Sequence, residues 1–146
     1  MLPEDNKVLV RRFFEELWNQ GNLVVADELL AADYVDHTPG VQPGSEGLKQ
    51  TVSEYLQDFS DIHATIEDQI VEGDMVVTRV TWNCKLTSGE QVTVTGIGID
   101  RIADGKIIES WNQSDVPRRV HFTRRKPPKC TCPPGTFCKD GLCVII

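Results

Sequence analysis

The chain has 146 residues and a net charge of −7, and it is 40% hydrophobic and 25% charged, the profile of an ordinary soluble globular protein. No apolar run approaches the length of a membrane span, and the composition excludes collagen-like, coiled-coil and wholly disordered chains. The first residues lack the basic-then-apolar pattern of a signal peptide, so we expect a cytoplasmic protein.

Charge and cysteine are unevenly distributed along the chain. Residues 1–117 hold eight Lys and Arg against 21 Asp and Glu, a net charge of −13, whereas residues 118–146 hold seven basic residues and only Asp140, a net charge of +6. Four of the five cysteines also lie in this second part. We therefore expect a globular domain over residues 1–121 and a basic, Cys-rich tail over residues 122–146. The acidic body argues against nucleic acid as a partner.

Three amphipathic helices are expected in the first 60 residues. Apolar residues recur at three- and four-residue steps over residues 5–20, 23–32 and 46–59, which is the helical spacing. Ser45 is placed to cap the third helix. Between the second and third helices, residues 33–37 lead into a loop marked by two Pro-Gly signals.

The hydrophobic pattern then changes from a helical to an alternating period. Apolar and polar residues alternate over residues 62–70, and β-branched alternation continues over 75–86, 91–102 and 106–115. Ala103-Asp104-Gly105 is typical of a tight hairpin turn. Helices followed by four or so antiparallel strands predict an α+β fold, with three N-terminal helices packed on a curved antiparallel sheet.

Several segments together resemble one known family. They are FFEELWNQGN at residues 13–22, ADYVDH at 32–37, GLKQ at 47–50 and RIADGKIIESWNQSD at 101–115. The pattern is similar to the SnoaL-like polyketide cyclases of the cystatin-like, or nuclear transport factor 2-like, superfamily. The resemblance implies a cone-shaped α+β barrel, with a ligand-binding pocket between the concave sheet and the helices. It also implies a homodimer formed through the outer face of the sheet.

The resemblance implies acid/base chemistry on a hydrophobic, polyketide-like small molecule, with no metal or organic cofactor. Such cyclases close a ring by aldol addition, using a pocket group that removes a proton beside a carbonyl. The family's acid/base Asp follows the Trp of the last strand, where this chain has Ser110-Trp111-Asn112. Asn does not exchange a proton at neutral pH, so this departure argues against a standard aldol cyclase. The alternatives are a non-catalytic ligand carrier and an interaction module tethered through its tail.

Asp36 and His37 are the strongest remaining catalytic candidates, as a base and its partner, with Asn112 polarising a carbonyl. The alternative is that His37 bonds a loop backbone while Asp36 caps the chain or faces water. Because side chains alternate along a strand, only one of Asn112 and Gln113 is expected to face the pocket. Asp100 is expected to be a strand-end or salt-bridge residue. Candidate ligand-binding residues are Trp18, Tyr34, Trp82, Ser110, Trp111 and Gln113.

The tail lies outside the family pattern. Four cysteines, Cys130, Cys132, Cys138 and Cys143, are candidates for two disulfides, with three connectivities open. Alternatively, Cys143 begins a C-terminal lipidation box, and only then is a membrane partner expected. A shared zinc is a weaker alternative because no C-x2-C pair is present, and an inert tail is another. Disulfides favour an oxidising or extracellular compartment, contrary to the cytoplasmic expectation.

Overall fold

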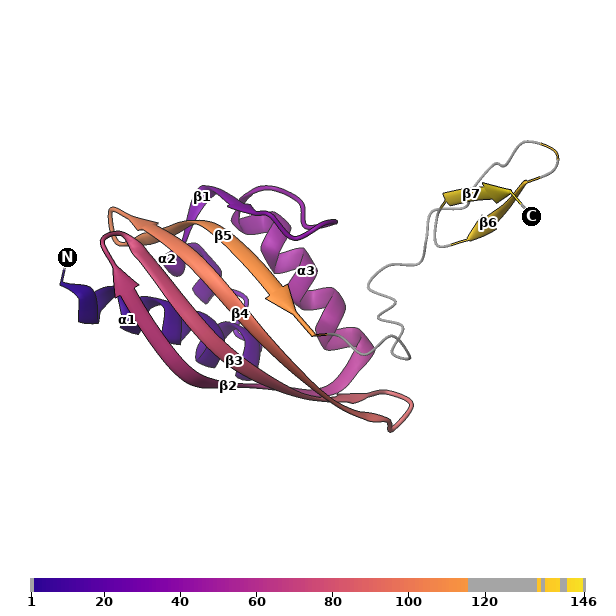
Figure 1. Cartoon of the computed structure of the whole chain (residues 1–146), viewed down its shortest axis with the longest axis horizontal. Helices are drawn as coiled ribbons and strands as arrows, with labels where there is room; N and C mark the ends of the chain where they lie inside the picture. The colour runs from indigo at the N-terminus through magenta and orange to yellow at the C-terminus, as the bar shows by residue number, and fades with distance from the viewer. Residues whose placement is uncertain (1, 116–133, 135, 140–141, 146) are drawn as a thin grey trace.

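A curved five-stranded sheet forms one layer of the molecule, and helices cover one of its faces (Figure 1). This computed structural model describes residues 2–115, 134, 136–139 and 142–145. The strands lie in the spatial order β1-β5-β4-β3-β2. Their bounds are β1 Leu30–Asp36, β2 Phe59–Glu72, β3 Met75–Leu86, β4 Gln91–Ala103 and β5 Lys106–Ser114. The predicted α+β class, with helices packed on a curved sheet, is confirmed.

The helical layer comes from the N-terminal part of the chain. α1 (Pro3–Arg12) starts with a proline in its first turn and continues directly as a wider π-helical segment, η1 (Phe13–Asn19). α2 (Val25–Leu29) and α3 (Gly44–Asp58) complete the layer. The N-cap of α3 is Pro43, so Ser45 lies inside the first turn and the prediction that it caps this helix is wrong.

The sheet is mixed, whereas the sequence predicted antiparallel strands only. The predicted second helix ends at Leu29, and the following seven residues form β1, which pairs in parallel with β5. Pairing with β5 satisfies backbone hydrogen bonds and buries Leu30 and Tyr34, and this tertiary gain outweighs the local helical pattern. As a result, the segment expected to lead into a loop is fixed beside the last strand.

The hairpins of the sheet agree with the sequence pattern. β3 spans the predicted residues 75–86, and β4 and β5 match their predicted ranges within one residue at each end. Asp104 and Gly105, between β4 and β5, have φ angles of 51° and 74°. Two consecutive residues with positive φ are the backbone of a primed hairpin turn, which explains the Asp-Gly pair at this point.

Polar residues of three neighbouring strands share the face of the sheet that the helices cover, called the inner face below. Asp36 of β1 is the Cα partner of Ser110 in β5, and Ser110 is the partner of Asp100 in β4. Asn112 of β5 likewise pairs with Gly98 of β4. Directly paired residues project to the same face of a sheet, so these side chains form adjacent rows.

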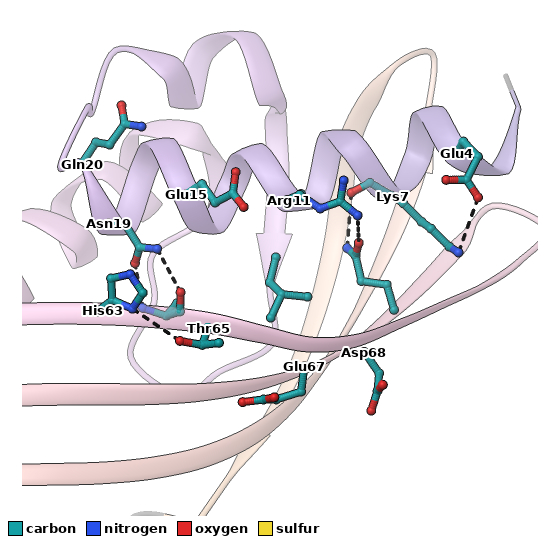
Figure 2. Close-up of a pocket in the computed structure, with 13 residues that line it drawn as sticks. Glu4, Lys7, Arg11, Glu15, Asn19, Gln20, His63, Thr65, Glu67 and Asp68 are labelled. Carbon is teal, nitrogen blue, oxygen red and sulfur yellow. Dashed lines mark hydrogen bonds and ion pairs between the residues drawn. The ribbon is translucent and has the colours of Figure 1, made fainter.

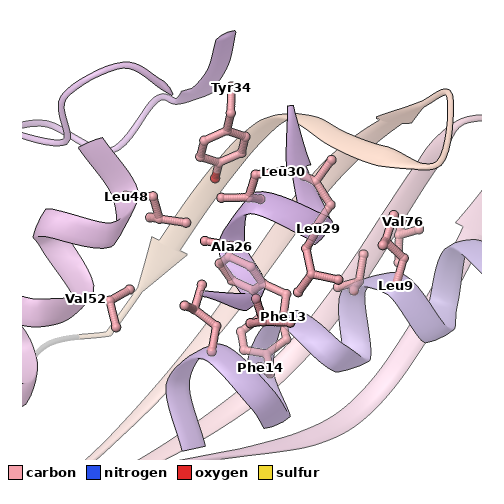
Figure 3. Close-up of a cluster of buried hydrophobic side chains, with 14 of the residues drawn as sticks. Leu9, Phe13, Phe14, Ala26, Leu29, Leu30, Tyr34, Leu48, Val52 and Val76 are labelled. Carbon is pink, nitrogen blue, oxygen red and sulfur yellow. The ribbon is translucent and has the colours of Figure 1, made fainter. Parts of the chain in front are cut away.

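The core lies between the helices and the inner face. Figure 3 shows side chains from η1, α2, α3 and β1 converging there. Its fully buried members include Val10, Leu17, Ala26, Leu29, Leu30, Tyr34, Leu48, Val52, Val76 and Ile107. Each buried Leu, Ile or Val contributes roughly 1.5–3 kcal/mol, so this cluster fixes all three helices on the sheet.

A separate two-stranded hairpin forms in the tail, from β6 (Thr136–Lys139) and β7 (Leu142–Ile145). Cys138 and Cys143 are Cα partners in this hairpin. Cys130, Cys132 and the predicted boundary at residue 121 lie outside the described residues, as do the side chains of Cys138 and Cys143. Disulfides, lipidation and zinc in the tail therefore remain predictions.

Candidate functional site

A pocket of about 190 Å³, called the cone pocket below, opens between α3, η1 and the inner face of the sheet. Its apolar walls consist mainly of Phe13, Trp18, Val41, Leu48, Tyr55, Phe59, Ile62, Trp82 and Val94. Its polar lining residues are Asp36, Thr38, Thr51, Asn112, Gln113 and Ser114. Except for Thr51 of α3, these come from β5 and from the end of β1 with the residues just after it. The pocket therefore has a polar side along the β1–β5 pair and apolar walls elsewhere.

Aromatic rings pack edge to face along the apolar wall. The ring centroids of Trp18 and Trp82 are 5.2 Å apart, and those of Trp18 and Tyr55 are 5.5 Å apart. Trp18 belongs to the π-helical segment η1, a type of helix that is rare and frequent at functional sites. The packed rings form a stiff apolar surface, which suits a flat hydrocarbon or aromatic molecule.

Asp36 brings a carboxylate to the polar side of the pocket. It is the last residue of β1, and its Oδ1 accepts a hydrogen bond of 2.8 Å from the backbone N–H of Thr38, a short turn that holds the side chain in place. The same oxygen accepts a 3.4 Å contact from Nδ2 of Asn112. A carboxylate and a neutral amide thus lie side by side on the pocket wall.

Gly98 makes room for the Asn112 amide. A Cβ atom on Gly98 would lie 2.8 Å from Oδ1 of Asn112, closer than real Cβ contacts come. The missing side chain lets the amide oxygen lie over β4 while Nδ2 turns toward Asp36. The glycine therefore helps to orient a polar group of the pocket.

A second carboxyl, Asp100, is buried behind Asp36 and does not line the pocket. It is 5% exposed and accepts a hydrogen bond from the Ser110 hydroxyl. Burial raises the pKa of Asp100 to about 7; the Ser110 hydrogen bond opposes this rise, and the negative charge of Asp36 adds to it. The expectation that Asp100 is a strand-end or salt-bridge residue is therefore wrong.

Tyr34 completes this buried polar group. Its hydroxyl oxygen is fully buried and has no hydrogen bond of standard geometry among the described residues. Burial, and after it the charge of Asp36, raises the pKa of this hydroxyl. Ser110 opposes the rise. Tyr34 and Ser110, predicted as ligand contacts, thus lie beneath the wall of the cone pocket instead of lining it.

His37 and Trp111 lie on the other face of the sheet. Their rings stack at 5.0 Å, and Nε2 of His37 is 2.7 Å from Oε2 of Glu109. Because successive residues of a strand face opposite sides, Asp36 and Asn112 point inward while their neighbours point outward. The structure therefore separates His37 from its predicted partner Asp36. The sequence predicts that residues 33–37 lead into a loop, and a loop carries no strand alternation that would place Asp36 and His37 on opposite faces.

The remaining predicted residues reach the pocket. Trp18, Trp82 and Asn112 line it, and so does Gln113, although alternation predicted that only one of the last two would. Asn112 and Gln113 both reach the pocket because they lie near the end of β5, which stops at Ser114. Within the described residues, no three His, Cys, Asp or Glu side chains gather in a way that could hold a metal ion.

A larger hollow, about 730 Å³, lies between α1, η1 and the edge strand β2 (Figure 2). Charged and polar side chains line it, and several bond to each other or to the backbone. Asn19 donates to the Ala64 carbonyl at 2.9 Å and accepts from the Ala64 N–H at 2.7 Å, so its amide replaces a strand partner. Such pairing protects a sheet edge from aggregation. We therefore explain this hollow as the groove left where α1 and η1 cover the edge strand β2.

An apolar cone between a curved sheet and its helices, with a few polar groups on one side, defines a class of small-molecule-binding α+β proteins. The sequence model of the SnoaL-like polyketide cyclases matches residues 8–118, and the chain belongs to this family. No curated protein matches the sequence. No helix in the described part of the chain is long and apolar enough to cross a membrane.

Solved structures agree with this assignment. TsrD from Streptomyces laurentii is similar, with 26% identity over 79% of this chain and 91% of its own and a TM-score of 0.73. A candidate polyketide cyclase from Bacillus cereus has 28% identity over 76% of this chain and 74% of its own, with a TM-score of 0.70. IdmH from Streptomyces antibioticus has 29% identity over 75% of this chain and 91% of its own, with a TM-score of 0.67.

Proposed function

We propose that the protein transfers a proton beside the carbonyl group of a small, mainly apolar ketone bound in the cone pocket, as a cyclase or an isomerase does. The observation that carries this proposal is the Asp36 carboxylate, held on the wall of an apolar pocket beside the Asn112 amide. A carboxylate in such a place is a suitable general base for a carbon acid. Membership of the polyketide cyclase family supports the same chemistry.

Each group has a distinct role in the proposed reaction. Asp36 removes a proton from the carbon next to the carbonyl, and the C–H electron pair becomes the enolate. One N–H of Asn112 already points to Asp36, and the second N–H of the same amide donates to the enolate oxygen. The proton then returns to another carbon in an isomerisation, or to the new alkoxide after ring closure. No electrons leave the substrate in either case.

The size of the pocket limits the substrate. Sites for drug-sized ligands measure roughly 300–1,000 Å³. The cone pocket, at about 190 Å³, is smaller and takes a molecule of one or two rings. We therefore narrow the predicted polyketide-like substrate to a short or partly cyclised ketone.

A non-catalytic carrier is the second candidate. The observation in its favour is Asn112, an amide at the position where the family resemblance expects an acid/base Asp. If Asp36 only forms a hydrogen bond to a ligand, the pocket binds that ligand without catalysing a reaction. The other alternative, an interaction module tethered through its tail, depends on tail side chains that lie outside the described residues.

β-Tetralone, a two-ring ketone with acidic C–H groups, is a probe that separates these functions. Its exchange of α-protons for deuterium in heavy water is followed by NMR, and its binding by the fluorescence of Trp18 and Trp82. The proposal expects exchange faster than in buffer, saturating with ketone concentration. Binding without exchange supports the carrier instead, and a protein that neither binds nor exchanges β-tetralone contradicts both.

We further propose that two copies pair through the outer face of the sheet, as the family resemblance implies. Ile70, Val77, Ile99 and Trp111 are successive cross-strand partners on this face. Ile70 is 65% exposed and nearby Ile97 is 51% exposed, although both are apolar. Contiguous exposed apolar area of this kind marks an interaction surface.

Light scattering after size exclusion tests the pairing. Wild type is expected to have twice the mass of the chain, and Ile97→Glu the mass of one copy, because a charge cannot be buried unpaired at an apolar interface. Val8→Glu is the matched control, since Val8 is an exposed apolar residue of α1, away from the sheet face. A monomeric wild type overturns the proposal.

A further inference from the structure

Three buried polar groups behind Asp36 have no part in the reaction proposed above. Tyr34 of β1, Asp100 of β4 and Ser110 of β5 are at most 5% exposed, and all lie beneath the pocket wall. Burying a carboxyl and a phenol among apolar side chains lowers stability unless each finds partners. A group of this kind needs a reason other than packing.

The backbone places the group directly against Asp36. Asp36, Ser110 and Asp100 are neighbours in one cross-strand row of the inner face, and directly paired Cβ atoms in a sheet are roughly 4.5–5.5 Å apart. Tyr34 precedes Asp36 by two residues on the same strand, so both side chains project to the same side. The row leads from the pocket, through Asp36 and two hydroxyl groups, to the buried carboxyl.

The hydrogen bonds in the row leave one position open. The Ser110 hydroxyl donates to Asp100, while the Tyr34 hydroxyl, 1% exposed, has no bond of standard geometry among the described residues. Besides burial, the pKa of the Tyr34 hydroxyl nevertheless depends on both neighbours, since Asp36 raises it and Ser110 lowers it. A hydrogen bond from the Tyr34 hydroxyl to Ser110 and one between Tyr34 and Asp36 would complete a chain of donors and acceptors between the two carboxyl groups.

The charges that act on Asp100 come from within this row. On β1, Asp36 carries a charge and Tyr34 is the other titratable group. On β5, Ser110 donates the hydrogen bond to Asp100. On β3, the residue paired with Asp100 is Val76, which is apolar. The pKa of Asp100, raised to about 7 mainly by burial, leaves both of its protonation states populated near neutral pH. A carboxyl in this state both accepts and returns a proton.

We propose that Tyr34, Ser110 and Asp100 form a proton relay behind Asp36, in which Asp100 stores the proton that Asp36 takes from the substrate. The relay rests on the proposed function. Asp36 gives its new proton to the Tyr34 hydroxyl as Tyr34 passes its own to Ser110 and Ser110 passes its own to the Asp100 carboxylate. Each hydroxyl gains and loses one proton, Asp36 regains its charge, and Asp100 becomes neutral. The proton returns along the same path in reverse; the α-proton is exchanged for deuterium when Asp36, half-buried in the pocket wall, instead takes a deuteron from water and passes it to the enolate.

Infrared titration of the buried carboxylic acid tests the relay without turnover. Wild type is expected to show a protonated carboxyl band that disappears with a midpoint near the pKa of about 7. Asp36→Asn removes the neighbouring charge and is expected to lower this midpoint by roughly one pH unit. Ser110→Ala removes the hydrogen bond that favours the ionised form and is expected to raise it. Asp100→Asn assigns the band by removing it.

An Asp100 midpoint that Asp36→Asn leaves unchanged overturns the relay, because the two carboxyl groups are then uncoupled. If Asp100→Asn fails to fold, the Asp36 and Ser110 variants still decide the question. Tyr34→Phe adds a kinetic readout: it is expected to leave the Asp100 midpoint in place and to remove the inflection near neutral pH from the exchange profile of β-tetralone. A retained inflection also overturns the relay. A wild type that shows the coupling but no exchange contradicts the proposed function alone.

Discussion

Replacing Asp36 by Asn is expected to slow the α-proton exchange of β-tetralone by roughly 10²- to 10⁴-fold, the usual contribution of a general base. The amide keeps the shape of the side chain and its oxygen still accepts the Thr38 N–H, so the turn after β1 persists. What is lost is the group that accepts the proton. Binding of the ketone, read from Trp18 and Trp82, is expected to change little because the apolar walls remain.

Asp33→Asn is the matched control for this loss. Asp33 belongs to the same strand, carries the same charge and is exposed, and it does not line the cone pocket. Its replacement is expected to leave the exchange rate within about twofold of wild type, since a distant exposed charge is screened by salt. Equal exchange rates for wild type and Asp36→Asn would contradict the role of Asp36 as the base.

Replacing Asp100 by Asn is expected to raise the free energy of unfolding relative to wild type as the pH rises from acid to mildly alkaline values. The folded-state pKa of about 7 lies above the value of 3.8 for an ordinary Asp, so the folded state binds more protons than the unfolded state between these limits. The contribution of Asp100 to the free energy of unfolding is therefore fully present below about pH 4 and is lost as the pH rises through about 7.

The size of this effect follows from the two pKa values. A rise from 3.8 to about 7 in a fully buried group corresponds to on the order of 4 kcal/mol. Urea denaturation at a series of pH values measures it as the difference between wild type and Asp100→Asn, in which all other titrations cancel. The free energy of unfolding of the variant is expected to increase relative to that of wild type as the pH rises to about 8. Parallel stability curves would mean that Asp100 ionises at its ordinary pKa.

Periodic segments with matching turns allowed most of the fold to be predicted. β3 and the β4–β5 hairpin follow from strict alternation and an Asp-Gly turn, both local signals. β1 was missed because its strand character comes from pairing with β5, more than 70 residues later, which no local pattern encodes. The change of helical pitch at Phe13 has no local sequence signal either.

The site was predictable only in part, for a similar reason. Asp36, Asn112, Trp18 and Trp82 follow from motif and residue type, and the structure brings all four to one pocket. Because the sequence predicts a helix over residues 23–32 and a lead into a loop over 33–37, strand alternation does not separate His37 from Asp36 at the level of sequence. The burial of Asp100 could not be predicted because an acidic residue in a strand is usually exposed. Its partners Ser110 and Asp36 come from two other strands, which no local pattern brings together.

The most direct test of the central claim is a crystal structure of the protein saturated with β-tetralone. The account predicts the ketone between Trp18 and the sheet, with its carbonyl oxygen within hydrogen-bond reach of Nδ2 of Asn112 and an α-carbon facing the Asp36 carboxylate. A ketone bound in the groove between α1 and β2, or oriented with both α-carbons away from Asp36, would contradict it.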